Sequence, residues 1–236
     1  MILYLVFLPL FVVLFNNCEN YINFLCEEYF CDNIIKSIKN EDSILTKKYR
    51  VVNFSKSTLL GVLSIPTFYL LRDVIFYPED VNYIIVSLFA ALYTSIDMAA
   101  LIYNSKNHIS TNVHHIVVQF LYLYIYYYDF AMINLVRPIV AYACYSVFAY
   151  LVNGRLSIRK LNLDSEIIIN NLSLVIYINT SILNWITQLY LLFFATPELP
   201  FLYTKMIYTA LMLLIVSDDI FLMKYLYNYN RQIKSD

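Results

Sequence analysis

The sequence predicts an all-α membrane protein, a bundle of six transmembrane helices preceded by an N-terminal hydrophobic helix, which makes about seven spans. Of its 236 residues, 61% are hydrophobic and only 14% are charged, and the mean hydropathy is +0.62. A soluble domain carries about 25% charged residues, so this excess of apolar side chains has no protein interior large enough to hold it. The apolar runs are long and continuous, and the chain has only two glycines, unlike the short alternating strands of a membrane barrel.

Seven apolar stretches approach the roughly 20 residues that a helix needs to cross about 30 Å of hydrocarbon. They are residues 1–18, 57–71, 81–105, 107–128, 130–154, 167–197 and 199–217. The short second stretch becomes a full span if it begins at Val51 and Lys56 extends its side chain to the membrane interface. The stretch 167–197 is long enough to require a strong tilt. The expected organisation is a hydrophobic helix at 1–18, a polar cytosolic segment at 19–46 and a six-span domain at 47–236.

The basic residues are distributed unequally between the two sides of this predicted bundle. Cytoplasmic loops collect Lys and Arg, and placing residues 19–56 in the cytosol puts thirteen of the sixteen basic residues on that side. The C-terminus is then cytosolic, and Arg137 on the opposite side is expected to anchor its span at the interface. A net charge of −1 gives no basic face for nucleic acid. Membrane lipids are the expected partners, and association with identical or different chains in the membrane is left open.

The sharpest local signal is a group of polar residues inside apolar segments. All three histidines, His108, His114 and His115, lie within eight residues at the predicted cytosolic start of the span 107–128. Asp97, in the preceding span, is as far from the connecting loop as His115, so the two side chains should share a depth. An ionisable group in a span costs about 2.5–3.5 kcal/mol and therefore needs a partner. A carboxylate beside an imidazole orients the ring and leaves its other nitrogen able to accept a proton.

We therefore predict that Asp97 orients a general base, which is His115 or His114. Adjacent helical residues point about 100° apart, so only one of the two histidines should face that centre. The alternative is that Asp97 and a histidine only join two helices, an interaction of about 0.6 kcal/mol. No metal ion is expected, because two neighbouring histidines and one aspartate are a poor tetrahedral set.

Further polar residues accompany this pair in other spans. Arg155, Asn184 and Gln188 are candidate lipid-binding residues, although a polar stripe such as Asn184 and Gln188, one turn apart, also suits hydrogen bonding between helices. Asp218 and Asp219 are either ion-paired at the end of the last span or a second proton-handling site. The chain has no glycine-rich nucleotide loop, and no cofactor is expected.

Two short motifs resemble the TLC-domain family, which includes ceramide synthases, TRAM proteins and CLN-type proteins. They are LYTSID at 92–97 and VHHIVV at 113–118, and the segments 145–148 and 153–155 add a weaker likeness. The resemblance covers roughly residues 47–236. It implies a six-span core with an Asp in its second span, a His pair opening its third, a cytosolic C-terminus, and a location in the endoplasmic reticulum or a related endomembrane.

Ceramide synthases of this family also carry a pair of aspartates after a histidine, which the resemblance would place within residues 142–149. That stretch reads YACYSVFA and has no carboxylate, so the likeness is closer to the non-synthase branch. The resemblance implies a protein that binds or alters membrane lipids through an Asp/His cavity. The alternatives are an acyltransferase of ceramide-synthase type, with His115 as base and acyl-CoA as co-substrate, and a non-enzymatic cargo or translocon accessory protein.

Overall fold

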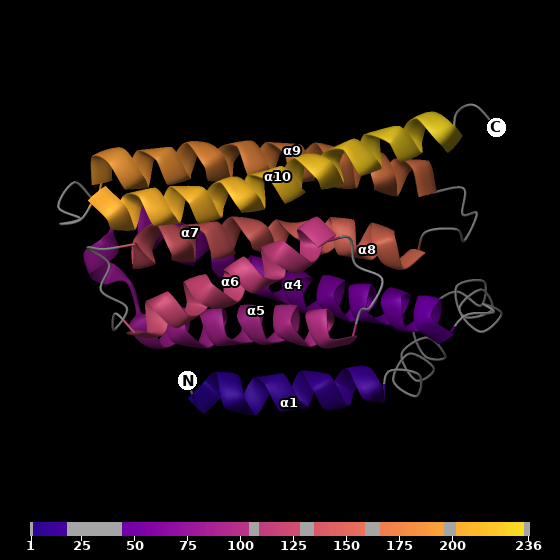
Figure 1. Cartoon of the computed structure of the whole chain (residues 1–236), viewed down its shortest axis with the longest axis horizontal. Coiled ribbons are helices and arrows are strands. Elements are labelled where there is room, and N and C mark those ends of the chain that lie inside the picture. Colours follow the sequence, from indigo (N-terminus) through magenta and orange to yellow (C-terminus); the bar gives the residue numbers. More distant parts are fainter. Residues whose placement is uncertain are drawn as a thin grey trace.

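The computed structural model describes residues 2–17, 44–103, 109–127, 135–158, 166–195 and 202–233. Within these ranges the chain forms helices and no strand. The helices lie side by side along the long axis of the molecule, and consecutive spans run in opposite directions (Figure 1). Five helical segments are long and apolar enough to cross a membrane. The prediction of an all-α, multi-pass membrane protein is therefore confirmed.

Each of the seven predicted stretches overlaps a described helical segment. The α-helices are α1 (Ile2–Asn16), α4 (Ile44–Phe76), α5 (Tyr83–Tyr103), α6 (Ile109–Tyr127), α7 (Val136–Ser146), α8 (Tyr150–Ile158), α9 (Glu166–Tyr190) and α10 (Leu202–Ile233). A 3-10 turn, η1 (Pro78–Asp80), follows α4, and another, η2 (Val147–Ala149), joins α7 and α8 into one span. A π-helical turn, η3 (Leu191–Ala195), continues α9.

Five of these segments meet the length and hydropathy of a membrane span. They are Val52–Phe76, Tyr83–Ile102, Val136–Ile158, Ile167–Ala195 and Tyr203–Tyr229. The apolar part of α1, Leu3–Val13, is shorter. Helix α6 has 19 residues, about 28 Å of helix, but polar residues and histidines occupy its first half. Of the predicted polar segment 19–46, only residues 44–46 are described, within α4, and His108 lies outside the described residues.

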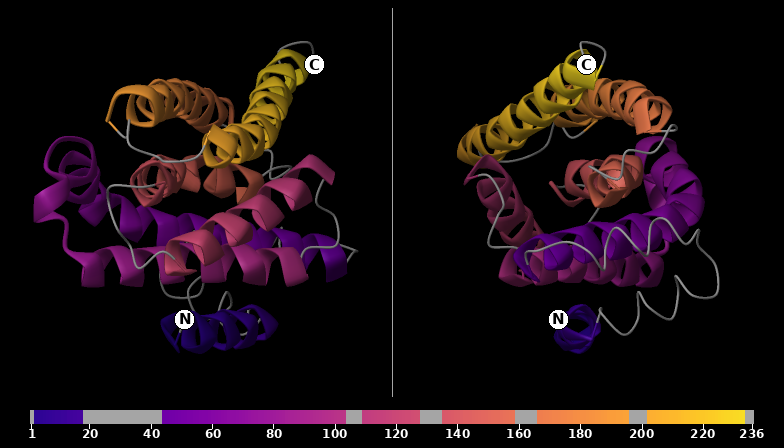
Figure 2. Two further views of the ribbon diagram at one scale, coloured as in Figure 1. Left: turned by 60° about the vertical axis from the view of Figure 1, so that its left-hand side comes forward. Right: turned by 90° about the vertical axis from the view of Figure 1, so that its right-hand side faces the viewer.

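The span formed by α7 and α8 lies at the centre of the bundle. The end-on view in Figure 2 shows α4, α5, α6, α9 and α10 around it, with α1 outside, against α5. Large apolar side chains such as Ile65, Ile84 and Phe194 point outward and remain exposed, as lipid-facing residues do. The packed interior is also apolar, and its fully buried members include Val74, Val86, Val136, Val147, Leu191 and Ile215.

Arg137 has a different environment from the one expected. Sequence analysis predicts an anchor at the membrane interface, but the side chain is buried at the start of α7. Its guanidinium donates hydrogen bonds to the carbonyls of Val74 and Ile75 at the end of α4, and to that of Ala195 at the end of η3. The last carbonyls of a helix have no donor within the helix, and a cation is favourable there. Arg137, at the start of α7, therefore connects this helix to the ends of α4 and η3.

The closest approach between α4 and α8 depends on Gly154. A Cβ atom at this position would lie 3.0 Å from Ser57 Oγ, whereas one at Gly61 would lie 3.8 Å from Tyr150. The Ser57 hydroxyl is held in place because it donates a hydrogen bond to the Tyr150 carbonyl over 2.8 Å. A Cβ at 154 therefore requires the Ser57 side chain to move by a few tenths of an ångström, and the hydrogen bond of its hydroxyl opposes this movement.

We expect Gly154→Val to lower the free energy of unfolding by about 1–3 kcal/mol, because over-packing forces side chains and backbone to move. Gly61→Ala is the matched control, since ordinary van der Waals space surrounds it, and it should be stabilising by about 0.5–1 kcal/mol. Thermal and denaturant unfolding of the detergent-purified variants measures both effects. Equal stability of Gly154→Val and the wild type would contradict the close-packing account.

Candidate functional site

A cavity of about 290 Å³ lies inside the bundle, towards the end where α5 is followed by α6. Helices α4 to α10 all contribute to its walls. Ligand sites usually enclose about 300–1,000 Å³, so this cavity is at the small end of that range. Its ionisable residues other than tyrosine are Lys56, Asp97, His114, His115, Asp218 and Asp219. Tyrosines, uncharged polar side chains such as Asn53 and Asn184, and apolar side chains such as Leu60, Ala100 and Leu222 also line the cavity.

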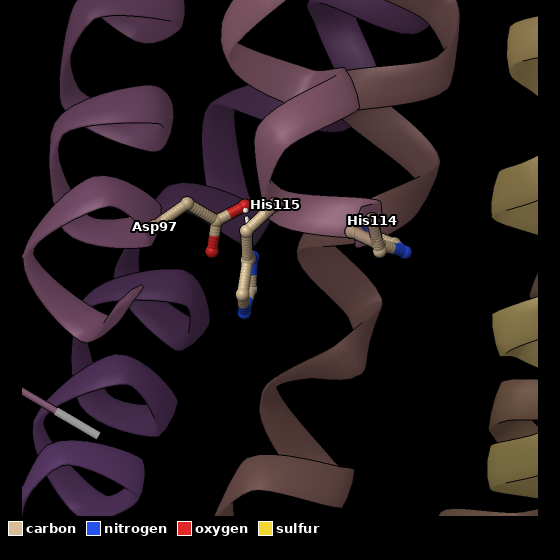
Figure 3. A group of neighbouring side chains, drawn as sticks. All are labelled: Asp97, His114 and His115. Atoms are coloured by element: carbon tan, nitrogen blue, oxygen red, sulfur yellow. Dashed lines mark ion pairs between the residues drawn. The ribbon is translucent and has the colours of Figure 1, made fainter. Parts of the chain in front are cut away.

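Asp97 and His115 meet in this cavity, as the sequence predicts. Asp97 is six residues before Tyr103, the last residue of α5, and His115 is six residues after Ile109, the first of α6. The two antiparallel helices therefore place them at one depth. His115 Nδ1 lies 3.4 Å from Asp97 Oδ2, and Figure 3 shows the other ring nitrogen directed away from the carboxylate. The role of His115 as a base stays a prediction.

The other Asp97 oxygen has a partner that sequence reasoning missed. Lys56 Nζ of α4 lies 2.6 Å from Asp97 Oδ1, and both side chains are buried. The expectation that Lys56 reaches the interface is therefore wrong, because an opposite charge at the same depth holds its ammonium group inside the bundle. The available signal was that Lys56 and Asp97 both lie near the predicted cytosolic ends of apolar spans. Lys56, Asp97 and His115 form a continuous chain of contacts across α4, α5 and α6.

His114 faces a second carboxylate, on the other side of α6. Its Nδ1 lies 3.3 Å from Asp218 Oδ2 of α10, and its Nε2 lies 3.1 Å from the hydroxyl of Tyr142. The Thr111 hydroxyl donates a hydrogen bond to Asp218 Oδ1. Only His115 faces Asp97 squarely, as expected, but both histidines line the same cavity. The adjacent rings point at two centres because α5 and α10 flank α6.

Asp219 extends the polar wall towards α9. Its Oδ1 accepts a hydrogen bond from the Tyr177 hydroxyl over 2.7 Å, and its Oδ2 accepts one from Trp185 Nε1 over 3.3 Å. Both adjacent aspartates of α10 therefore line the cavity. The sequence alone is compatible with either an ion-paired helix end or a proton-handling site for these two aspartates, and in the structure both line the cavity.

The three candidate lipid-binding residues have different environments. Asn184 lines the cavity, whereas Gln188 and Arg155 do not. The Gln188 amide donates to Asn184 Oδ1 and to the Pro138 carbonyl, and its oxygen accepts a hydrogen bond from Tyr208. These contacts join α7, α9 and α10. Asn184 and Gln188 therefore form hydrogen bonds between helices, which is the alternative to lipid binding that the sequence allows.

Arg155 likewise joins helices. It is 2% exposed, its Nε donates to Asn170 Oδ1 over 2.9 Å, and its guanidinium carbon lies 4.3 Å from the centre of the Tyr229 ring. The Asn170 amide in turn donates to the Leu226 carbonyl. The residue is therefore packed between α8, α9 and α10, away from the cavity lining.

No protein-family model matches the chain, and neither does any curated protein or solved structure. The fold and the cavity define a class of protein all the same, a multi-pass helical membrane protein with a cavity among its helices that is lined by buried ionisable side chains.

Proposed function

We propose that the chain is a TLC-like endomembrane protein that binds or alters membrane lipids through the Asp97/His115 cavity. The single observation that carries the proposal is this cavity lined by buried ionisable side chains from the candidate membrane spans, since ionisable groups inside transmembrane helices usually mark functional sites. The TLC-like motifs and the loop charges support a location in the endoplasmic reticulum or a related membrane, with a cytosolic C-terminus.

The chemistry of the lining suits part of a lipid. Lys56, the histidines and the three aspartates provide hydrogen bonds and charges for a polar headgroup, and Leu60, Ala100 and Leu222 provide apolar contact. A cavity of about 290 Å³ is too small for a whole membrane lipid, so the headgroup and the adjoining part of a chain are the portion that it accepts. His115, held by Asp97 on one side, is the residue assigned to contact the headgroup.

A lipidomic comparison tests the proposal. Membranes of cells that express the wild type, His115→Ala or no protein are compared at matched expression, with Asn179→Ala as the control because Asn179 is exposed on α9. We expect the wild type and Asn179→Ala to change the same lipid class. His115→Ala should reduce that change at least tenfold. An identical lipid profile with and without the wild type would contradict the proposal.

An acyltransferase is the second candidate, and one observation favours it. The stretch 142–149 has no carboxylate, but Asp218 and Asp219 of α10 bring two carboxylates into the cavity beside His114. Charge-stabilising groups near a histidine base are what such a transfer needs. The lipidomic samples therefore include an incubation with acyl-CoA and a long-chain amine. An N-acyl product with the wild type, absent with His115→Ala, would support the enzyme over a binding protein.

A further inference from the structure

We propose that Asp97, His114, His115 and Asp218 form a binding site for a divalent transition-metal ion, with Zn²⁺ as the first ion to test. The proposal goes beyond the lipid function and does not depend on it. Imidazole nitrogens and carboxylate oxygens are ligands that Zn²⁺ uses, usually in a tetrahedral set of four. Sequence analysis expects no metal because it finds only two histidines and one aspartate together. Helix α10 supplies the fourth group, Asp218.

The first observation is a group of buried polar atoms that lack hydrogen bonds. Asp97 Oδ2, His114 Nδ1 and His115 Nδ1 are all buried and form no hydrogen bond with any residue that the structure describes, although each Nδ1 lies within ion-pair distance of a carboxylate. Buried polar groups almost always have a partner, so three such atoms in neighbouring side chains require an explanation. One ligand atom from each of these three residues falls within 4.8 Å of the others. A cation between them would satisfy all three.

The second observation is the distance between the paired atoms. His115 Nδ1 and Asp97 Oδ2 are 3.4 Å apart, and His114 Nδ1 and Asp218 Oδ2 are 3.3 Å apart. These distances exceed those of good charge-assisted hydrogen bonds, which are about 2.7–2.9 Å. Ligand atoms bonded at about 2.0–2.1 Å to a tetrahedral Zn²⁺ ion are about 3.3 Å apart. Figure 3 shows the His114 ring directed away from Asp97, so a single ion would bring this ring inward.

The third observation is that three of the four proposed ligands are held through their other polar atom. Lys56 contacts Asp97 Oδ1, Tyr142 contacts His114 Nε2, and Thr111 donates to Asp218 Oδ1. Metal-binding histidines and carboxylates are usually oriented in this way by a second hydrogen bond on the atom that does not bind the ion. The arrangement leaves Asp97 Oδ2 and His114 Nδ1, which form no hydrogen bond with a described residue, available to a cation.

The charge of the cavity also fits a divalent ion. With neutral histidines, Asp97, Asp218 and Asp219 carry three negative charges and Lys56 carries one positive charge, a net charge of −2 in the lining that the structure describes. Unbalanced charge inside a bundle is unfavourable in a low-dielectric medium. One divalent cation brings the net charge to zero.

Metal analysis of the 236-residue chain tests this site. The protein is purified in detergent, its affinity tag is removed, and it is stripped with a chelator, incubated with one equivalent of Zn²⁺ and desalted. We expect about one zinc per chain for the wild type and at least a fivefold lower content for the His114→Ala/His115→Ala variant. Thr180→Ala is the control, because Thr180 lines the cavity without belonging to the proposed set and its hydroxyl donates to carbonyls of its own helix, and it should retain the metal.

A second readout keeps the test decisive if the double variant does not fold. Co²⁺ added to the stripped wild type should give the intense visible bands of a tetrahedral site, and Zn²⁺ should abolish them. Absence of zinc and of these bands in the wild type would overturn the proposal. Equal zinc in a folded double variant would also overturn it, since the metal would then be adventitious. The wild-type results separate the two proposals: absence of zinc from the wild type leaves the lipidomic comparison intact, and an unchanged lipid profile leaves the zinc content intact. His115→Ala is expected to lower both, since His115 is a proposed zinc ligand and the proposed headgroup contact.

Discussion

Lys56→Met is expected to lower the free energy of unfolding by about 3–5 kcal/mol, the usual effect of removing one partner from a buried ion pair. Lys56 Nζ and Asp97 Oδ1 are 2.6 Å apart, and the side chains of Lys56 and Asp97 are only 9% and 4% exposed. Without the ammonium group, the Asp97 carboxylate remains buried, with only the more distant His115 nitrogen beside it. Thermal unfolding and loss of monodisperse protein in detergent measure the effect.

The double variant Lys56→Met/Asp97→Leu separates charge from packing. Replacing a whole buried ion pair by apolar residues is often neutral or stabilising, so this variant should regain most of the stability that Lys56→Met loses. The coupling between the two positions then follows from a double-mutant cycle. If Lys56→Met is as stable as the wild type, or if the second substitution adds a further loss, the ion pair does not contribute in the way described here.

Arg137→Met is expected to lower the free energy of unfolding by about 2–3 kcal/mol, because hydrogen bonds from a charged donor to carbonyls at helix ends are lost in a buried place. The guanidinium contacts Val74, Ile75 and Ala195, so one substitution releases the ends of both α4 and η3. Denaturant unfolding gives the size of the loss, and proteolysis near residues 74–82 reports fraying of the end of α4.

Two further variants control for charge. Arg137→Lys keeps the positive charge but not the planar, forked set of donors, so its loss should be intermediate. Arg72→Met removes a side chain that pairs with Asp73 while 59% exposed, and it should leave stability nearly unchanged. If Arg72→Met and Arg137→Met lower the free energy of unfolding equally, the effect comes from positive charge at this end of the bundle and not from hydrogen bonds of Arg137 to the carbonyls at the helix ends.

Hydropathy along the chain predicted where the described helical segments lie, because each apolar run must cross the same thickness of hydrocarbon. Seven spans were expected, and five of the described segments are long and apolar enough to be spans. The shared depth of Asp97 and His115 followed from counting residues on either side of one short loop. The depth of a residue in the membrane can be counted from the loop of a helical hairpin. The rotation of each helix about its axis and the identity of its neighbouring helices cannot be counted in this way. Lys56 and Asp97 are 41 residues apart in sequence, and their contact depends on which face of α4 turns towards α5.

Because sequence does not reveal which helices are neighbours, it also does not reveal which polar residues face the cavity. Arg155 and Gln188 carry polar groups in apolar spans, and such groups bind helices together as readily as they bind ligands. Asp218 reaches the cavity because α10 packs against α6, and no spacing in the sequence encodes that packing. The TLC-like motifs indicated the residues of α5 and α6 but contained nothing about α10.

The hydrogen bond between Asp219 and Trp185 makes tryptophan fluorescence sensitive to changes at the cavity. The protein has a single tryptophan, Trp185, whose indole N–H donates to Asp219 Oδ2 beside the cavity. Asp218, the adjacent residue of α10, contacts His114. A ligand that moves α10 at this point disturbs both contacts together, so the emission of one indole registers occupancy without any attached label.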